Sequence, residues 1–196
     1  MKREQVEELL YQALETEMGG VRVYETAVRC AQNDDLAKEW GEYLEQTRNH
    51  ERIMRRVLET FGLARETQTL GREIVKAKGQ SLVQAMERAL AADRGTAQLV
   101  AAECVVEAET KDHMNWELIA EVAGKLQGDE AKALKRAYQE VEEEEDEHLY
   151  HTMGWARELW LESLGLPAIL PPPEEKKHVK TAIGAARAKQ AREDLL

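Results

Sequence analysis

One stretch of this chain limits its fold more than any other feature, because apolar side chains recur there in alternating steps of four and three residues. These steps follow one face of an α-helix, which has about 3.6 residues per turn. Asn33-Asp34-Asp35 supplies a turn and an N-terminal cap before the stripe, and Gly62 ends it. The pattern therefore predicts a long helix with two polar residues on its buried face. Its stripe is Leu36, Trp40, Tyr43, Thr47, His50, Met54, Val57 and Phe61.

Three further segments show the same helical spacing. The first runs over about 6–31, another over about 96–126, and the last begins after the stop and cap at Gly128-Asp129. Its pattern breaks at Pro167. With only 5% aromatic residues against 33% charged residues, the composition is typical of long amphipathic helices, and we expect almost no strand.

The segment between the two pairs of long helices is less regular. Residues 63–95 contain Gly71, Gly79 and Gly95, and only a short helix over about 82–90 is predicted within them. Two helical hairpins joined by such a crossover form an all-α four-helix bundle. We predict this bundle over 1–166. Residues 167–196 then form a proline-rich spacer followed by a basic, weakly amphipathic tail helix.

Charge and composition exclude several function classes. The net charge of −11 disfavours nonspecific nucleic-acid binding, and no Lys/Arg cluster offsets it. No apolar run approaches the roughly 18 residues that a membrane span needs. Cys30 and Cys104 belong to no Cys-x-x-Cys pair, and no phosphate-binding loop or nucleophile elbow is present. We predict a cytoplasmic, reduced protein that binds neither nucleic acid nor a membrane.

Three histidines lie on three different predicted helices, and each has a carboxylate or amide four residues earlier. The pairs are Gln46/His50, Glu109/His113 and Glu144/His148, and Glu17 interrupts the apolar stripe of the first helix. Residues four apart share one helix face, so each pair can reach a common point on the bundle axis. Burying several imidazoles and carboxylates without a cation costs several kcal/mol each, on the order of the desolvation of buried charge. The arrangement predicts a buried metal site.

Two positions of this set stay open in the sequence. A second stripe through Val105, Asp112 and Ile119 fits the third helix almost as well as the stripe through Glu109. The run from Glu142 to Glu147 has the composition of a solvated face, so only one of Glu144 and Glu145 can be central.

The residues that carry a family resemblance lie on all four predicted long helices. They are Glu17, the segment Leu44-Glu45-Gln46-Thr47-Arg48-Asn49-His50, Glu109, and Glu145-Asp146-Glu147-His148. With them the chain resembles the ferritin/rubrerythrin superfamily over residues 1 to about 165. The Leu-Glu-x-Thr-x-x-His segment is similar to that of the small, stress-induced bacterial ferritin-like proteins, whose function is poorly defined.

The resemblance implies a site for two metal ions, held by one Glu from each of two helices and a Glu-x-x-His motif from each of the other two. It gives Glu17 and Glu109 the single-Glu roles and Glu145-x-x-His148 one motif. The second motif departs from the pattern, because Thr47 stands three residues before His50. We expect His113 to compensate by facing the same cavity. The implied cofactor is two iron ions, with manganese or a zinc ion as alternatives.

The leading functional hypothesis is a metal-binding ferritin-like protein that reacts with dioxygen or peroxide. Its predicted ligands are Glu17, His50, Glu109, His113, Glu144 or Glu145, and His148. The alternative is a non-catalytic helical bundle with a structural zinc ion or no metal, which serves in protein association. Trp160, Leu161, Leu164 and Leu166 form an apolar end to the last bundle helix, and we predict a homodimer.

Overall fold

The computed structural model describes residues 1–169 and 173. Within them the protein is all-helical and contains no strand, as the sequence predicts. The predicted tail helix lies outside the described residues. None of the described helices is long and apolar enough to span a membrane. The helices are α1 (Arg3–Cys30), α2 (Asp34–Thr60), α3 (Leu70–Ala92), α4 (Arg94–Ala123) and α5 (Gly128–Ser163).

The stripe that defines α2 is buried along its length, from Leu36 to Phe61. Asn33 caps the helix as predicted, since its side chain accepts hydrogen bonds from the backbone N–H groups of Asp35 and Leu36 at 2.9 and 3.1 Å. Gly62 adopts φ of 68°, a left-handed conformation that ends the helix at little cost for glycine. Local sequence therefore sets both ends of α2.

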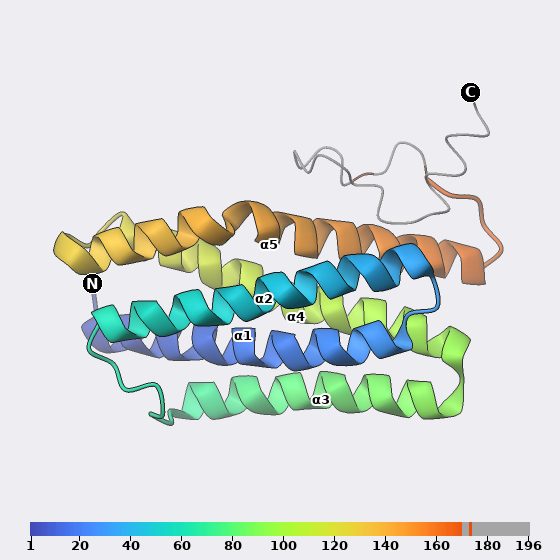
Figure 1. Ribbon diagram of the computed structural model, residues 1–196, viewed down its shortest axis with the longest axis horizontal. Coiled ribbons are helices and arrows are strands. Elements are labelled where there is room, and N and C mark those ends of the chain that lie inside the picture. Colours follow the sequence, from blue (N-terminus) through green and yellow to red (C-terminus); the bar gives the residue numbers. More distant parts are fainter. Residues whose placement is uncertain (170–172, 174–196) are drawn as a thin grey trace.

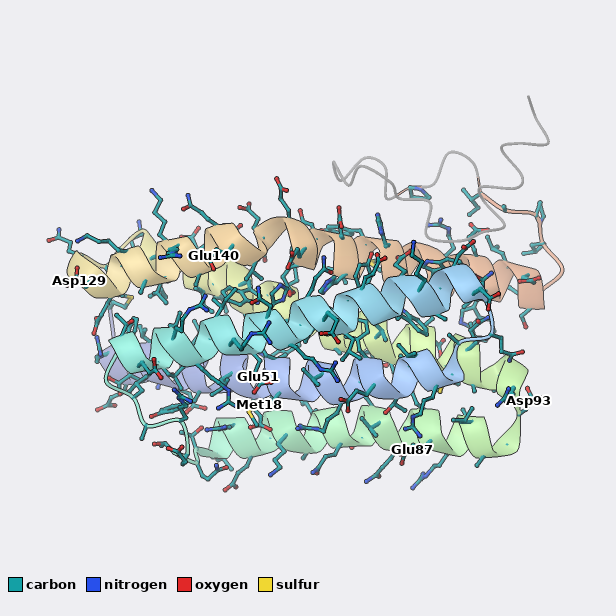
Figure 2. The ribbon with its side chains drawn as sticks, in the orientation of Figure 1. Met18, Glu51, Glu87, Asp93, Asp129 and Glu140 are labelled. Atoms are coloured by element: carbon teal, nitrogen blue, oxygen red, sulfur yellow. The ribbon has the colours of Figure 1, made fainter. Side chains whose placement is uncertain are left out.

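The five helices run back and forth along one long axis (Figure 1). The long helices α1, α2, α5 and α4 contact one another in that order around a bundle, and the bundle closes where α4 meets α1. Helix α3 lies outside it against α1 and α4. In Figure 2 Met18 projects from α1 toward α3, and Asp93 marks the turn into α4. Because α3 covers its outer side, α1 is buried on most of its circumference.

The crossover differs from the prediction, because it forms a helix of 23 residues instead of a short one. The glycines in this segment do not break it. A Cβ at Gly79 would lie 3.7 Å from the Cα of Gly19, so the two glycines allow α3 and α1 to approach closely. Arg72 near its start is buried and pairs with Glu15 of α1, at 2.9 Å from Nε to Oε2. Packing against α1 stabilises this helix beyond its local propensity.

The boundaries of α1, α2, α4 and α5 agree with the prediction to within a few residues. Asp93 caps α4, where its carboxylate accepts from the Thr96 N–H at 2.7 Å. Asp129 is not the cap of α5, because Gln127 occupies that position and Asp129 lies in the first turn. Its carboxylate still lies near the positive end of the helix dipole.

The bundle interior consists of two apolar clusters, one toward each end. The first includes Tyr24, Trp40 and Trp155, and the second includes Leu14, Met54 and Trp116. Every bundle helix passes through both clusters and carries buried polar residues between them. We call this middle zone the polar layer. It consists of Glu17, Thr47, His50, Glu109, Asp112, Glu145 and His148.

Candidate metal centre

All members of the polar layer are buried. Glu17, His50 and His148 are fully inaccessible to solvent, and Glu145 is 2% exposed. They come from all four bundle helices, so no local segment could assemble this set alone. Buried carboxylates and imidazoles are stable only when they are paired, hydrogen-bonded or bound to a cation.

The layer contains two groups of donor atoms. Within each group, the atoms lie within 4.8 Å of one another. One is formed by His50, Glu145 and His148, and the other by Glu17, Asp112 and Glu145. Glu145 belongs to both. Glu109 adjoins the first group, with its Oε2 3.7 Å from Nδ1 of His148. The arrangement offers two adjacent cation positions with a shared carboxylate.

Six buried side-chain atoms of these residues have no hydrogen-bond partner among the described residues. They are Oε2 of Glu17, Nδ1 of His50, Oε2 of Glu109, Oδ1 of Asp112, Oε2 of Glu145 and Nδ1 of His148. Buried polar atoms without partners are rare in folded proteins, and each needs a physical reason. Here they come from four helices, and their residues form or adjoin the two donor groups. Donors of this kind fit cations such as iron and manganese.

The outer nitrogen of each histidine is held by a residue of the opposite helix. His50 Nε2 donates to Glu144 at 2.6 Å, and His148 Nε2 donates to Gln46 at 2.8 Å. Glu144 is ionised, because its hydrogen bond with His50 lowers its pKa. Carboxylate and amide oxygens accept hydrogen bonds, so each imidazole directs Nε2 to its outer partner and leaves Nδ1 without a hydrogen-bond partner among the described residues. This is the arrangement that orients metal-binding histidines.

The predicted pairs therefore exchange partners between helices. Gln46 does not act with His50 of its own helix but with His148 of α5, while Glu144 of α5 supports His50 of α2. Two further contacts join α1 to α4 and to α5. The Trp116 indole of α4 donates to Oε1 of Glu17 at 2.9 Å, and the Tyr24 ring of α1 lies 5.8 Å from that of His148. The two halves of the layer support each other reciprocally.

One contact in the layer is repulsive without a positive charge. Nδ1 of His50 lies 2.8 Å from Oε1 of Glu145 but makes no hydrogen bond. Two lone pairs at this distance repel unless a proton or a cation lies between them. Burial, followed by the neighbouring carboxylates, raises the pKa of Glu17, Asp112 and Glu145 well above the ordinary values. A bound cation would favour the ionised carboxylates and so lower these pKa values.

Thr47 contributes no donor to this space. Its hydroxyl donates to the backbone carbonyl of Tyr43 at 2.9 Å, one turn earlier. Its methyl group packs against Gly20, where an added Cβ would lie only 3.1 Å away. The carboxylate that α2 lacks is supplied by Asp112 of α4 instead. In the sequence Asp112 lies on a stripe next to that of Glu109, and its three-residue spacing from Glu109 indicates a shared helix face.

The expectation for His113 is not met. Its side chain is 19% exposed and lies between Asp146 and Glu117, at 3.4 Å and 3.5 Å, outside both donor groups. It follows Asp112 by one residue and so points about 100° around the helix. Of the two acidic candidates on α5, Glu145 lies in the polar layer. Glu144 lies outside the layer, and its side chain is 36% exposed. The other predicted residues, Glu17, His50, Glu109 and His148, lie together in the layer.

A second network borders the layer on the side of α2 and α5. The Tyr43 ring lies 4.3 Å from that of His148, and its hydroxyl is 2.8 Å from Nδ1 of His151 and 3.0 Å from Glu39. Burial, followed by the Glu39 charge, raises the pKa of Tyr43. Tyr43 therefore stays neutral, and its ring packs against the histidine ring at an interplanar angle of 41°.

Comparisons with protein-family models, with curated proteins and with solved structures find no match. The resemblance to the ferritin/rubrerythrin superfamily stays a prediction from the residues that carry it.

Proposed function

We propose that this protein is a ferritin-like metal-binding protein, whose polar layer binds two iron or manganese ions and reacts with peroxide or dioxygen. The observation that carries the proposal is the set of six buried donor atoms without partners, two of which are nitrogens of imidazole rings that Glu144 and Gln46 hold from outside. Bound iron or manganese would supply one-electron chemistry to the oxidant.

The charge of the layer supports two divalent ions over one. Glu17, Glu109, Asp112 and Glu145, when ionised, carry the charge that neutralises two such cations. A single structural zinc ion prefers a closed tetrahedral set of cysteine and histidine ligands. This layer instead has more carboxylates than histidines, and no cysteine, which favours iron or manganese.

The chain's own residues would position the ions and exclude bulk water. Glu145 lies in both donor groups and is placed to bridge the two positions. Glu144 and Gln46 fix the imidazoles from outside, and the two apolar clusters close the layer at both ends. An enclosed site of fixed shape is the contribution that a protein makes to a metal site.

Metal-loaded protein tests the proposal. Iron or manganese at about two ions per chain, with a change in the visible spectrum and consumption of peroxide, is the expected result. Glu145→Gln should abolish both, while Glu143→Gln, the same change at an exposed neighbouring position, should alter neither. Zinc binding without any reaction, or no metal after loading, would favour the association hypothesis.

We also propose that the apolar end of α5 pairs two copies of the chain. Trp160 and Leu164 are 43% and 63% exposed there. Exposed apolar side chains near one another are typical of association surfaces. Light scattering of the protein and of a Leu164→Glu variant tests this: a dimer that becomes a monomer supports it, and a monomer in both cases contradicts it.

A further inference from the structure

A cavity lies where α3 meets α1 and α4, and its volume is about 560 Å³. Small residues create it, because Gly20 of α1, Gly79 of α3 and Ala108 of α4 leave space that larger side chains would fill. The lining residues Lys78 and Thr110 are exposed, so the cavity opens to solvent. Pockets of roughly 300–1,000 Å³ are the size that binds small organic molecules.

The walls of this cavity are apolar where they are buried. The aliphatic side chains in the lining are Val23, Val75, Leu82 and Val106. Three hydroxyls also line it, but each donates to a backbone carbonyl of its own helix. These bonds measure 2.8 Å for Thr16, 3.0 Å for Ser81 and 2.7 Å for Thr110. The hydroxyl protons are therefore engaged within the protein, and the walls suit an aliphatic chain.

Two ammonium groups border the same cavity, one from Lys78 of α3 and one from Lys111 of α4. Lys111 is partly buried and donates to Oδ1 of Asn115. Asn115 is fully buried, and its amide donates to the Thr16 hydroxyl at 3.0 Å. The amide therefore holds the Lys111 ammonium at the cavity. Among the described residues, neither lysine forms an ion pair with a carboxylate.

The two ammonium groups lie close enough to repel each other. Burial lowers the pKa of Lys111, the Asp112 charge raises it, and the Lys78 charge lowers it again. A bound anion would relieve this repulsion, because it attracts both groups.

The charge of the lining indicates how many negative charges the ligand carries. Glu15 lines the cavity but is paired with Arg72 of α3 at 2.9 Å. The remaining carboxylate of the lining is that of Glu107, which is exposed. Two ammonium groups against this one carboxylate leave a single positive charge. A ligand with one negative charge and an apolar body therefore complements the cavity.

We infer that the cavity between α1, α3 and α4 binds an aliphatic carboxylate such as a medium-chain fatty acid. Its carboxylate lies between Lys78 and Lys111, and its chain lies along the aliphatic lining. Charge-assisted hydrogen bonds from the ammonium groups fix the head group, and burial of the chain supplies most of the affinity. This binding site is separate from the proposed metal function and does not depend on it.

Calorimetric titration of the full chain with octanoate tests the inference. We expect one octanoate bound per chain. Affinity should rise about tenfold from hexanoate to octanoate, because two more methylene groups are buried. Octanol, which has the same chain length without the charge, should bind at least about tenfold more weakly, since hydrogen bonds to charged groups are the stronger ones.

Two variants and a matched control locate the site. Lys111→Met keeps the apolar stem and removes the charge, so it should weaken octanoate at least about tenfold and leave octanol unchanged. Lys76→Met makes the same change on α3 outside the lining and should alter octanoate binding by less than about twofold. Ala108→Leu fills the cavity and should weaken octanoate and octanol together. It also tests the site if Lys111→Met fails to fold.

Several results would overturn the inference. They are no octanoate binding to wild type, an equal loss in Lys111→Met and Lys76→Met, or full binding to Ala108→Leu. Equal affinities for butyrate, hexanoate and octanoate would also contradict it, because the chain would then lie outside the cavity. The metal content of wild type is a separate measurement, so the failure of one proposal leaves the other standing.

Discussion

Each half of the polar layer contributes one histidine, but the two halves contribute different numbers of carboxylates. In the α1/α2 half, formed by Glu17, Thr47 and His50, one carboxylate is present. In the α4/α5 half, formed by Glu109, Asp112, Glu145 and His148, there are three. The residues three before the histidines are Thr47 and Glu145, and those three after Glu17 and Glu109 are Gly20 and Asp112.

The carboxylates of the layer are therefore distributed unevenly between the helices, and only the whole bundle contains the full set of donors. Thr47 packs on Gly20, where there is no room for a longer side chain on both, while Asp112 supplies a carboxylate from the facing helix. On α2 alone the motif lacks a carboxylate, because Thr47 occupies its position. The polar layer as a whole still contains four carboxylates.

The largest effect should follow from Glu145→Gln, because Glu145 belongs to both donor groups. Loss of an outer-shell partner already costs about 10- to 100-fold in metal affinity, and loss of a shared ligand should cost at least about 100-fold. After loading with iron or manganese, the metal content measured by elemental analysis should fall from two ions per chain in wild type to nearly none in the variant.

The matched position in the other half provides the control. Thr47→Val keeps the shape of the side chain and removes only a hydroxyl that bonds to the backbone. It should leave the metal content unchanged. A loss of metal in this variant as large as that in Glu145→Gln would show that Thr47 takes part in the site and would break the comparison.

The next effect should be the loss of one ion and not of both. Asp112→Asn removes a carboxylate from the group with Glu17, whereas Glu109→Gln removes the one beside His148. Each variant should retain about one ion per chain, with affinity for the other reduced at least about tenfold. Native mass spectrometry counts the ions. Loss of both ions in either variant would contradict two separable positions.

A smaller effect should follow at the outer partners of the histidines. Glu144→Ala and Gln46→Ala each free one Nε2 and should lower metal affinity by about 10- to 100-fold, measured by competition with a chelator. The effect should be larger for Glu144, because a charged acceptor makes the stronger bond. Glu144→Gln keeps an acceptor and should recover most of the affinity. Identical losses in Glu144→Ala and Glu144→Gln would contradict this role.

The smallest effect concerns the stability of the metal-free protein. Folding raises the pKa of Glu17, Asp112 and Glu145, so the native state binds more protons than the unfolded state above the ordinary carboxylate range. Their stabilising contribution is complete below about pH 4 and declines as pH rises toward the raised pKa values. From pH 5 to pH 8 the Tm of wild type should therefore fall more than that of Glu145→Gln, measured by calorimetry. Parallel curves would contradict the pKa shift.

Most of the fold could be predicted from the sequence, because helix periodicity and caps are local properties. Asn33 and Gly62 mark the ends of α2 as expected. The length of α3 could not be predicted, because Gly71 and Gly79 are ordinarily helix-weakening residues. Gly79 instead permits close packing on α1, and Arg72 pairs with Glu15, and both contacts join segments distant in sequence.

The sequence predicts which residues form the polar layer better than it predicts the contacts between them. Glu17 and His50 lie where they interrupt an apolar stripe, and that interruption is visible in the sequence. The choice between Asp112 and His113 cannot be made from the sequence. The two residues are adjacent, and only the rotation of α4 against its neighbours decides which one faces inward. The exchange of Gln46 and Glu144 between histidines also depends on packing of α2 against α5.

The central claim is that two cations occupy the polar layer with Glu145 between them. Crystals of the iron- or manganese-loaded protein, measured at the absorption edge of the metal, test it most directly. We predict two anomalous peaks about 3.5–4 Å apart, the separation typical of two-metal sites, flanked by His50 and His148. Metal-loaded crystals that show no peak in the layer, or one peak coordinated by neither histidine, would contradict the account.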